Sequence, residues 1–213
     1  MPEPSDAIRN YIFAKDGNRP FLMRQAFAEN ADLEMVVKTD AINFPSTTRG
    51  VDGVAEVVVR RFAQDYENIH TFCLTAPPAA ASTRFACHWL VGMSARSDGQ
   101  IRVGCGRYDW YFGRDGLAEK LVIAIEIMNV LPAAELSASM NWLSALPNPW
   151  CSAEAALKSL PRSDGLAEIK AYLKKFVPSL ARNRHAREGQ GGCPCALLHT
   201  VFGLSWGLPG GPP

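Results

Sequence analysis

The stretch CHWLVGMSARSDGQIRVGCGRYDW, from Cys87 to Trp110, decides the fold. Two runs rich in apolar, aromatic and β-branched residues flank a turn sequence, which predicts two antiparallel strands. Asp98-Gly99 is typical of a two-residue hairpin turn. Such a turn would place His88 opposite Asp109 and Leu90 opposite Arg107. Opposed side chains lie on the same face of the sheet, about 5 Å apart at Cβ.

A second turn at Asp115-Gly116 joins this hairpin to LAEKLVIAIEIMNV, residues 117–130. A two-residue turn here would pair Arg107 with Ala124 and Cys105 with Glu126. One face of the three strands would then gather four polar side chains: His88, Arg107, Asp109 and Glu126. The opposite face would hold large apolar side chains: Phe85, Trp89, Tyr108, Trp110, Phe112, Ile123, Ile125 and Ile127.

Two interpretations of the polar face remain open at this point. Its small neighbours Gly92, Val122 and Ala124 would leave room for a pocket. Alternatively, the aromatic face is the core, and the polar face is solvated with cross-strand ion pairs that contribute only ~0.2–1 kcal/mol each. A slip of one residue in either turn would also reverse the faces of one strand.

The rest of the first 132 residues predicts helices followed by strands. Apolar residues recur at helical spacing near the N-terminus, and LEMVVKT has the composition of a strand. Helices followed by an antiparallel meander indicate an α+β domain that ends near Pro132. The expected elements are helices at 8–12, 22–30 and 51–66, then strands at 33–39, 69–76, 83–95, 101–112 and 117–130.

The remaining residues predict two further segments. Residues 133–176 are expected to form a helical extension, because Leu166, Ile169, Leu173 and Phe176 follow a helical spacing. Residues 177–213 are rich in Gly and Pro, which predicts a disordered tail.

Composition narrows the possible partners. The net charge is +1, with 47% hydrophobic and 20% charged residues. No nucleic-acid partner is therefore expected. No apolar run approaches the ~18 residues of a membrane span, and no signal peptide is evident, so we expect a cytoplasmic protein without a membrane partner. Of the six cysteines, Cys193 and Cys195 are the one close pair. Their spacing is not that of a usual zinc motif, so no metal site is expected.

Four stretches together resemble the nuclear transport factor 2-like superfamily, in its SnoaL-like branch. They are IRNYIFAKDGNRPFLMRQAFAENADLEMVV (8–37), RGVDGVAEVV (49–58), GRYDWYFGRDG (106–116) and IEIMNVLP (125–132). The resemblance implies a cone-shaped α+β barrel, a curved antiparallel sheet wrapped on N-terminal helices. It further implies a pocket for a small apolar molecule at the open end and a homodimer formed through the outer sheet face.

The superfamily includes cofactor-free enzymes and non-catalytic members, so two functions are expected. The first is a cofactor-free acid/base enzyme, of cyclase, isomerase or dehydratase type, acting on a small apolar carbonyl-bearing or polyketide-like molecule. Asp109 or Glu126 would move a proton, His88 would relay it, and Arg107 would stabilise negative charge. The alternative is a non-catalytic small-molecule-binding or dimeric interaction module. The expected ligand-binding residues are Tyr11, Tyr66, Asp40 and Leu90.

Overall fold

The structure of the protein is a computed structural model that describes residues 2–177. The predicted disordered tail, apart from residue 177, lies outside the described residues. The elements are α1 (Pro4–Asp16), η1 (Pro20–Gln25), β1 (Phe27–Val37), β2 (Thr47–Arg49), α2 (Val51–Ala55), η2 (Glu56–Arg61), α3 (Phe62–Asp65), β3 (Tyr66–Cys73), β4 (Arg84–Ala95), β5 (Ile101–Phe112), β6 (Ala118–Leu131), η3 (Ala133–Glu135), α4 (Leu136–Ser144), α5 (Ala153–Lys158), η4 (Asp164–Leu166) and α6 (Ala167–Lys174).

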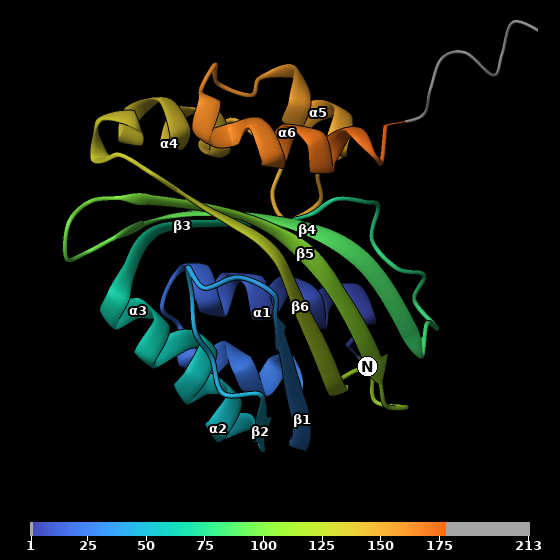
Figure 1. Ribbon diagram of the computed structural model, residues 1–213. Coiled ribbons are helices and arrows are strands. Elements are labelled where there is room, and N and C mark those ends of the chain that lie inside the picture. The colour runs from blue at the N-terminus through green and yellow to red at the C-terminus, as the bar shows by residue number, and fades with distance from the viewer. Residues whose placement is uncertain (1, 178–213) are drawn as a thin grey trace, which may run out of the picture. The chain divides into compact units, whose positions relative to one another are not determined.

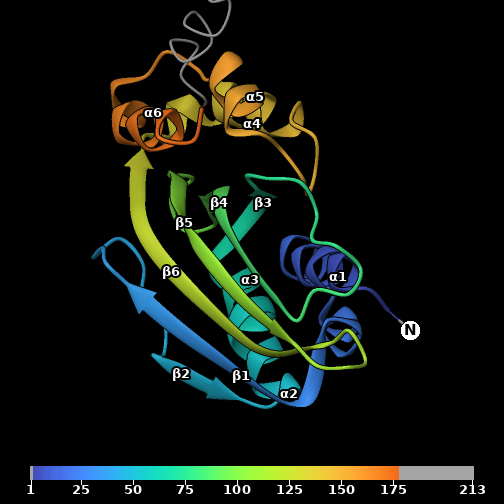
Figure 2. The same ribbon diagram turned by 90° about the vertical axis from the view of Figure 1, so that its right-hand side faces the viewer.

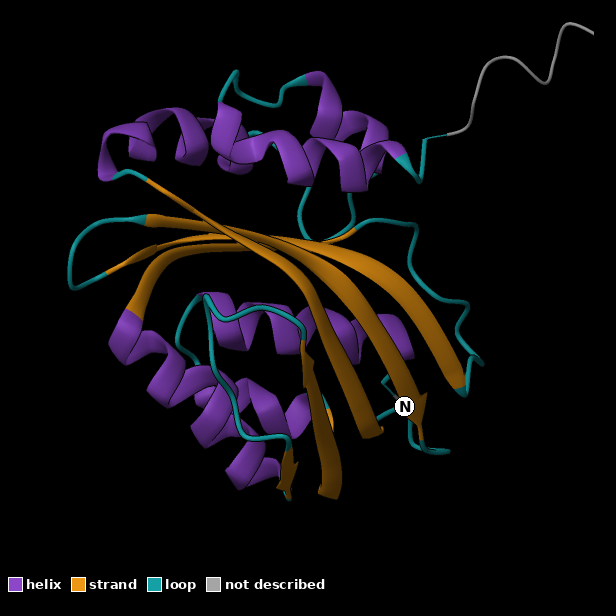
Figure 3. Ribbon diagram, viewed as in Figure 1, coloured by secondary structure: helices purple, strands orange, loops and turns teal. Residues whose placement is uncertain are grey.

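One curved sheet separates two layers of helices (Figure 1). Its six strands follow the order β2-β1-β6-β5-β4-β3. The pairs from β3 to β6 are antiparallel, as predicted, whereas β1 and β6 run parallel. The helices α1 to α3 lie within the curve of the sheet, and α4 to α6 cover its other face (Figures 2 and 3). The predicted fold class, an α+β cone with a C-terminal helical part, is confirmed.

The helices of the concave layer follow from their apolar stripes. In α1, Ile8, Tyr11 and Ile12 are almost completely buried, and they share one face of the helix. Residues 51–65 form a continuous helical run with a π-helical middle, which matches the predicted helix. The helix expected at 22–30 is shorter, because Phe27 already belongs to β1. Its backbone pairs there with Ala118 of β6.

The register of the β4–β5 hairpin differs from the prediction by two residues. His88 lies opposite Arg107, and Ala86 lies opposite Asp109. The last pair is Ser94 with Ile101, so the connection is longer than the expected two-residue turn. Since side chains alternate with a period of two, this shift leaves every side chain on its predicted face. The predicted pairing of His88 with Asp109 is wrong.

A bulge changes the register of β5 and β6. Arg107 pairs with Ala124 as predicted, but Cys105 pairs with Ile127 and Gly106 with Ile125. Glu126 is therefore the extra residue of the bulge and lies opposite no single residue of β5. For this reason the predicted pairing of Cys105 with Glu126 is wrong. Beyond the bulge Ile127 packs with the outer cluster, not with the aromatic face to which it was assigned.

The outer face of the sheet is covered by the chain's own helices. Buried side chains of β3, β4 and β5 pack there against α4 and α6, and Leu90, Leu143, Ile169 and Leu173 are fully buried. Residues 1–177 accordingly form one compact unit, with the helical extension packed on the barrel residues. The outer sheet face, through which the resemblance implied a homodimer, is covered by this helical layer. The homodimer itself stays a prediction.

The loop between α4 and α5 completes the edge of the sheet at β3. Cys73 N donates to Pro149 O at 2.7 Å, and Cys151 N donates to Cys73 O at 3.0 Å. Asn148 Nδ2 also donates to Thr71 O at 2.8 Å. Three backbone groups of this edge strand, Cys73 N, Cys73 O and Thr71 O, are thereby satisfied from the extension.

Candidate small-molecule site

A narrow cavity lies between the concave face of the sheet and the helices. Its volume is about 50 Å³, which suits one or a few waters. Side chains from α1, η2, α3 and the strands β1, β4, β5 and β6 form its wall. The lining residues are Tyr11, Lys15, Met35, Ile42, Phe44, Val58, Phe62, Trp89, Val91, Met93, Tyr108, Ile123, Ile125 and Met128.

Aromatic side chains close one side of this cavity. The ring of Tyr11 meets those of Tyr108 and Trp110 edge-on, with centroids 5.9 Å and 5.3 Å apart. Trp89 stacks on Tyr108 at 5.6 Å. Burial raises the pKa of Tyr11 and that of Tyr108. Both phenols therefore stay protonated and can act as hydrogen-bond donors.

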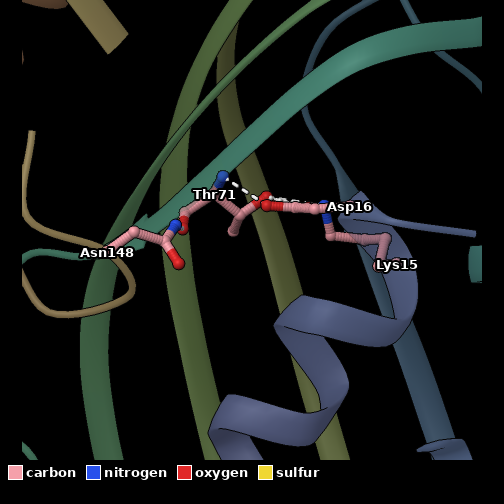
Figure 4. A network of polar contacts seen from close by, with 4 residues as sticks. All are labelled: Lys15, Asp16, Thr71 and Asn148. Carbon is pink, nitrogen blue, oxygen red and sulfur yellow. Dashed lines mark hydrogen bonds and ion pairs between the residues drawn. The ribbon is translucent and has the colours of Figure 1, made fainter. Parts of the chain in front are cut away.

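A buried ion pair stands at the cavity wall (Figure 4). Lys15 Nζ lies 2.6 Å from Asp16 Oδ1 and 2.6 Å from Thr71 Oγ1. Thr71 N donates to Asp16 Oδ2 at 2.7 Å, and the Thr71 hydroxyl donates to Asp16 Oδ1 at 2.8 Å. The side chains of Lys15 and Asp16 are 8% and 13% exposed, so each charge is largely removed from water and compensated by the other.

The ammonium of Lys15 also faces an aromatic ring of the cavity. Its Nζ lies 5.4 Å from the ring centroid of Phe62, within the range of a cation–π contact. Two of the three ammonium protons are used by Asp16 and Thr71. The third remains for an acceptor on the cavity side.

The cavity is richer in hydrogen-bond donors than in acceptors. Trp89 Nε1 is buried and has no hydrogen-bond partner among the described residues. Together with the hydroxyls of Tyr11 and Tyr108 and the ammonium of Lys15, it supplies donors in an apolar surround. The part of the lining that the structure describes contains neither a carboxylate nor an imidazole. This chemistry suits an occupant with a hydrogen-bond acceptor.

The four predicted ligand-binding residues do not come together. Tyr11 lines the cavity. Leu90 is buried on the outer face with the C-terminal helices, because its position in β4 points away from the cone. Tyr66 is half-buried, packs on Phe62 and lies beneath the guanidinium of Arg102. Asp40 follows the end of β1 and borders a groove on the outer side.

The four predicted catalytic residues lie on the outer side of the sheet. Arg107 and Asp109 form an ion pair with Nε 3.1 Å from Oδ1. His88 Nδ1 lies 2.7 Å from the hydroxyl of Tyr172, which donates to Gly106 O at 3.1 Å. Burial lowers the pKa of His88, while the nearby Glu126 carboxylate opposes this shift.

These four residues are thus neighbours, as the face assignment predicted, but they do not line the cone cavity. The aromatic face lines the cone instead, which decides between the two interpretations of the sheet. A catalytic role of His88, Arg107, Asp109 and Glu126 stays a prediction, and it would have to operate beneath α6 rather than in the cone.

The sequence contains a signal for the buried ion pair. Ile8, Tyr11, Ile12 and Lys15 continue one helical stripe at i, i+3, i+4 and i+7, so Lys15 belongs to the buried face of α1. A lysine at such a position needs a buried partner. Asp16 was the adjacent candidate, whereas Thr71 could not be identified without the tertiary fold.

Comparisons with known proteins find likeness in structure alone. No family model and no curated protein matches the sequence. A putative isomerase from Rhodopseudomonas palustris is 15% identical with a TM-score of 0.49, covering 65% of this chain and 99% of that one. A Mycobacterium tuberculosis protein is 10% identical with a TM-score of 0.48, covering 61% and 98%. A nuclear transport factor 2-like superfamily protein from Salmonella enterica is 17% identical with a TM-score of 0.44, covering 58% and 88%.

The Salmonella enterica neighbour carries the superfamily name that the sequence resemblance had suggested. The Mycobacterium tuberculosis protein has also been solved with estradiol-17beta-hemisuccinate. At such low identities and TM-scores, the function of this chain has to follow from its own residues.

Residues 2–177 contain no group of three or more His, Cys, Asp or Glu side chains arranged to hold a metal ion. No helix in the same range is long and apolar enough to cross a membrane.

Proposed function

We propose that the protein binds a small, largely apolar molecule with one neutral hydrogen-bond acceptor in the cone cavity, and that it does so without catalysis. The observation that carries this proposal is the lining, in which apolar side chains surround protonated hydroxyls and an ion-paired ammonium. An acid/base reaction needs a group that accepts a proton at working pH. The described lining offers none.

The buried ion pair determines the preferred charge of the ligand. The positive charge of Lys15 is already balanced by Asp16 at 2.6 Å. A carboxylate ligand would add an uncompensated charge to an apolar cavity, which is costly. A neutral carbonyl or hydroxyl oxygen can instead accept from Tyr11, Tyr108 or Lys15 without changing the net charge.

The cavity must widen to admit a ring-sized molecule, since ligand pockets commonly measure ~300–1,000 Å³. Three methionines, Met35, Met93 and Met128, lie in its wall. Methionine side chains are unbranched and repack easily around an occupant. We therefore infer that binding moves these methionines while the strands stay in place.

Binding can be tested with three probes of similar size and different head groups. Protein with 13C-labelled methionine methyl groups is titrated with cyclohexanone, methylcyclohexane and cyclohexanecarboxylate, and the methyl resonances are followed by NMR. We expect saturable shifts of Met35, Met93 and Met128, with affinity falling in the order ketone, hydrocarbon, carboxylate. Equal affinity for the carboxylate, or shifts that spare these methionines, would contradict the proposal.

A matched pair of variants identifies the donor. Tyr11→Phe removes a hydroxyl in the cavity wall, and we expect it to weaken cyclohexanone binding about fivefold while hydrocarbon binding is kept. Tyr66→Phe changes a tyrosine outside the cavity and should leave both affinities unchanged. His88→Ala and Asp109→Asn should also leave them unchanged, because both side chains lie on the outer side of the sheet.

A cofactor-free acid/base enzyme of cyclase, isomerase or dehydratase type is the second candidate. The observation in its favour is that Asp16 places a carboxylate directly behind Lys15, next to the cavity. Such an enzyme should exchange the α-protons of cyclohexanone for deuterium in D2O, which NMR detects. The binding proposal predicts no exchange above the buffer rate. Deuterium exchange that disappears in Asp16→Asn would contradict the binding proposal and favour the enzyme.

A further inference from the structure

A second depression lies on the opposite side of the sheet, between α6, β6 and the residues that follow β1. This outer groove has a volume of about 540 Å³, and its lining is largely polar. It is built partly by α6 of the helical extension and is separate from the cone cavity, with which it shares Met128. Its lining residues are Lys38, Thr39, Asp40, Glu126, Ile127, Met128, Asn129, Glu168, Ala171, Tyr172 and Lys175.

The two long walls of the outer groove run in opposite directions. Asn129 Nδ2 donates to Gly165 O at 2.5 Å, which places residue 129 beside the start of α6. Tyr172 lies further along the helix and is close to Glu126, whose carboxylate contributes to the raised pKa of its phenol. β6 and α6 therefore run antiparallel along the groove, so Glu126 lies near the C-terminal half of α6 and Asn129 lies near its N-terminus.

The segment after β1 can be placed in the same way. Lys38 N donates to Ile125 O at 3.0 Å, so Lys38 lies at the Glu126 end of the outer groove. Arg102 Nε contacts Ala41 O at 3.5 Å, and Arg102 pairs with Val130. Asp40, the neighbour of Ala41, consequently lies towards the Asn129 end.

The charges are unevenly distributed along the outer groove as a result. Lys38 and Lys175 lie at the Glu126 end together with the Glu126 carboxylate, and Asp40 and Glu168 lie at the Asn129 end. The formal charges of these side chains therefore sum to +1 at the first end and −2 at the second. Glu168 and Lys175 are seven residues apart, about two helical turns or ~10 Å along α6. None of the five charged lining groups forms a salt bridge with another described residue.

The Glu126 end rests on a fixed support. Tyr172 is 2% exposed, and its hydroxyl donates to Gly106 O while it lies 2.7 Å from His88 Nδ1. These two contacts hold the phenol of Tyr172 against the bulge that carries Glu126. The wall of the outer groove at this end is therefore ordered, while Lys38 and Lys175 are exposed and can reach a ligand, and Glu126 is half-buried.

We propose that the outer groove binds a short aliphatic zwitterion, with its carboxylate between Lys38 and Lys175 and its ammonium between Asp40 and Glu168. The ligand carboxylate would meet two ammonium groups, which outnumber the single Glu126 carboxylate at that end, and the ligand ammonium would meet two carboxylates. A simple anion or cation would satisfy only one end of the groove. This binding is independent of the cone cavity.

The test uses 6-aminohexanoate, with hexanoate and hexylamine as probes that lack one charge each. The 15N-labelled full chain is titrated and its amide shifts are followed by NMR. We expect 6-aminohexanoate to bind at least about fivefold more tightly than either control, with shifts at residues 126–129 and 168–175. Added salt should weaken this binding. Equal affinity for the three probes, no saturable shift, or shifts elsewhere would overturn the proposal.

Two variants assign the ends of the ligand. Glu168→Gln should weaken binding of 6-aminohexanoate and hexylamine about fivefold and leave hexanoate unchanged. Lys175→Gln should weaken 6-aminohexanoate and hexanoate and leave hexylamine unchanged. Lys174→Gln is the matched control, because Lys174 is exposed on α6 but does not line the groove. The same loss in Lys174→Gln would show a general charge effect and overturn the assignment.

Discussion

At the scale of single residues, Thr71 holds the buried ion pair together. Its hydroxyl accepts from Lys15 and donates to Asp16, and its backbone N–H donates to the second oxygen of Asp16. Thr71 itself is completely buried. One small side chain thereby satisfies two charges that would be costly to leave with fewer partners.

Thr71→Val keeps the shape of the side chain and removes the hydroxyl. We expect it to lower the free energy of unfolding by about 1–3 kcal/mol, because Lys15 and Asp16 each lose a buried hydrogen bond. Chemical denaturation measures this change. Thr48→Val, at a half-buried threonine of β2 whose hydroxyl makes no hydrogen bond to another described residue, should change stability by less than about 0.5 kcal/mol. Equal effects of the two variants would contradict the role of Thr71.

The two described histidines predict a dependence of stability on pH. Burial lowers the pKa of His70 and of His88 below the ordinary 6.5. Below about pH 6.5 the unfolded chain takes up protons before the folded one, so stability is full above this pH and falls on acidification. Urea unfolding at pH 7.5 and 5.5 should show this loss.

Replacing these histidines should reduce the pH dependence. We expect His88→Gln and His70→Gln each to diminish the difference in unfolding free energy between the two pH values, and the double variant to diminish it further. An unchanged difference in the double variant would show that other groups, and not these imidazoles, cause the acid sensitivity.

At the scale of elements, the order of helices and strands could be predicted from the sequence, and so could the faces of β4 and β5. Alternation and helical spacing are local properties, and they survive a two-residue error in a turn. The register could not be predicted, because the longer loop before Ile101 and the bulge at Glu126 depend on contacts across the sheet. The packing of α4 to α6 on the outer face of the sheet could not be predicted either, since the apolar stripe of a helix does not identify the surface on which it packs.

Gly106 marks the point where β5 and β6 change register. A Cβ at this position would collide with Ala124 O and with the indole of Trp89. We expect Gly106→Ala to lower the free energy of unfolding by about 1–3 kcal/mol, because backbone must move to relieve the contact. Gly53→Ala in α2 is the control, since the nearest atom is a side-chain methyl group of Thr48. Comparable losses in both variants would contradict the close approach at the bulge.

At the scale of the whole molecule, the sequence suggested a boundary at Pro132 between a barrel domain and an extension. The structure packs the two as layers on one sheet, with Phe72, Leu90 and Val103 buried beneath Trp142 and Leu173. A large apolar face would be exposed without the helices.

A chain ending at Pro132 should therefore fail to form a stable monomer. We expect it to aggregate or to lose cooperative unfolding, while a chain ending at Val177 unfolds cooperatively; size-exclusion chromatography and denaturation compare the two. Leu143→Ala in the full chain is a milder test, because Leu143 packs directly on Gly92 of β4. It should cost about 2–5 kcal/mol. A monomeric, cooperatively unfolding 1–132 would show that the barrel is independent.

The loop at Asn148–Cys151 has a consequence for folding during synthesis. It supplies the last backbone partners of β3, and the helices on either side of it close the apolar face of the sheet. During synthesis, all the described strands are made before residue 151. Until the loop and its helices are complete, the nascent chain has an unpaired sheet edge and an exposed apolar face. Chaperones bind such surfaces, and the rate of translation over the last residues then affects the yield of folded protein.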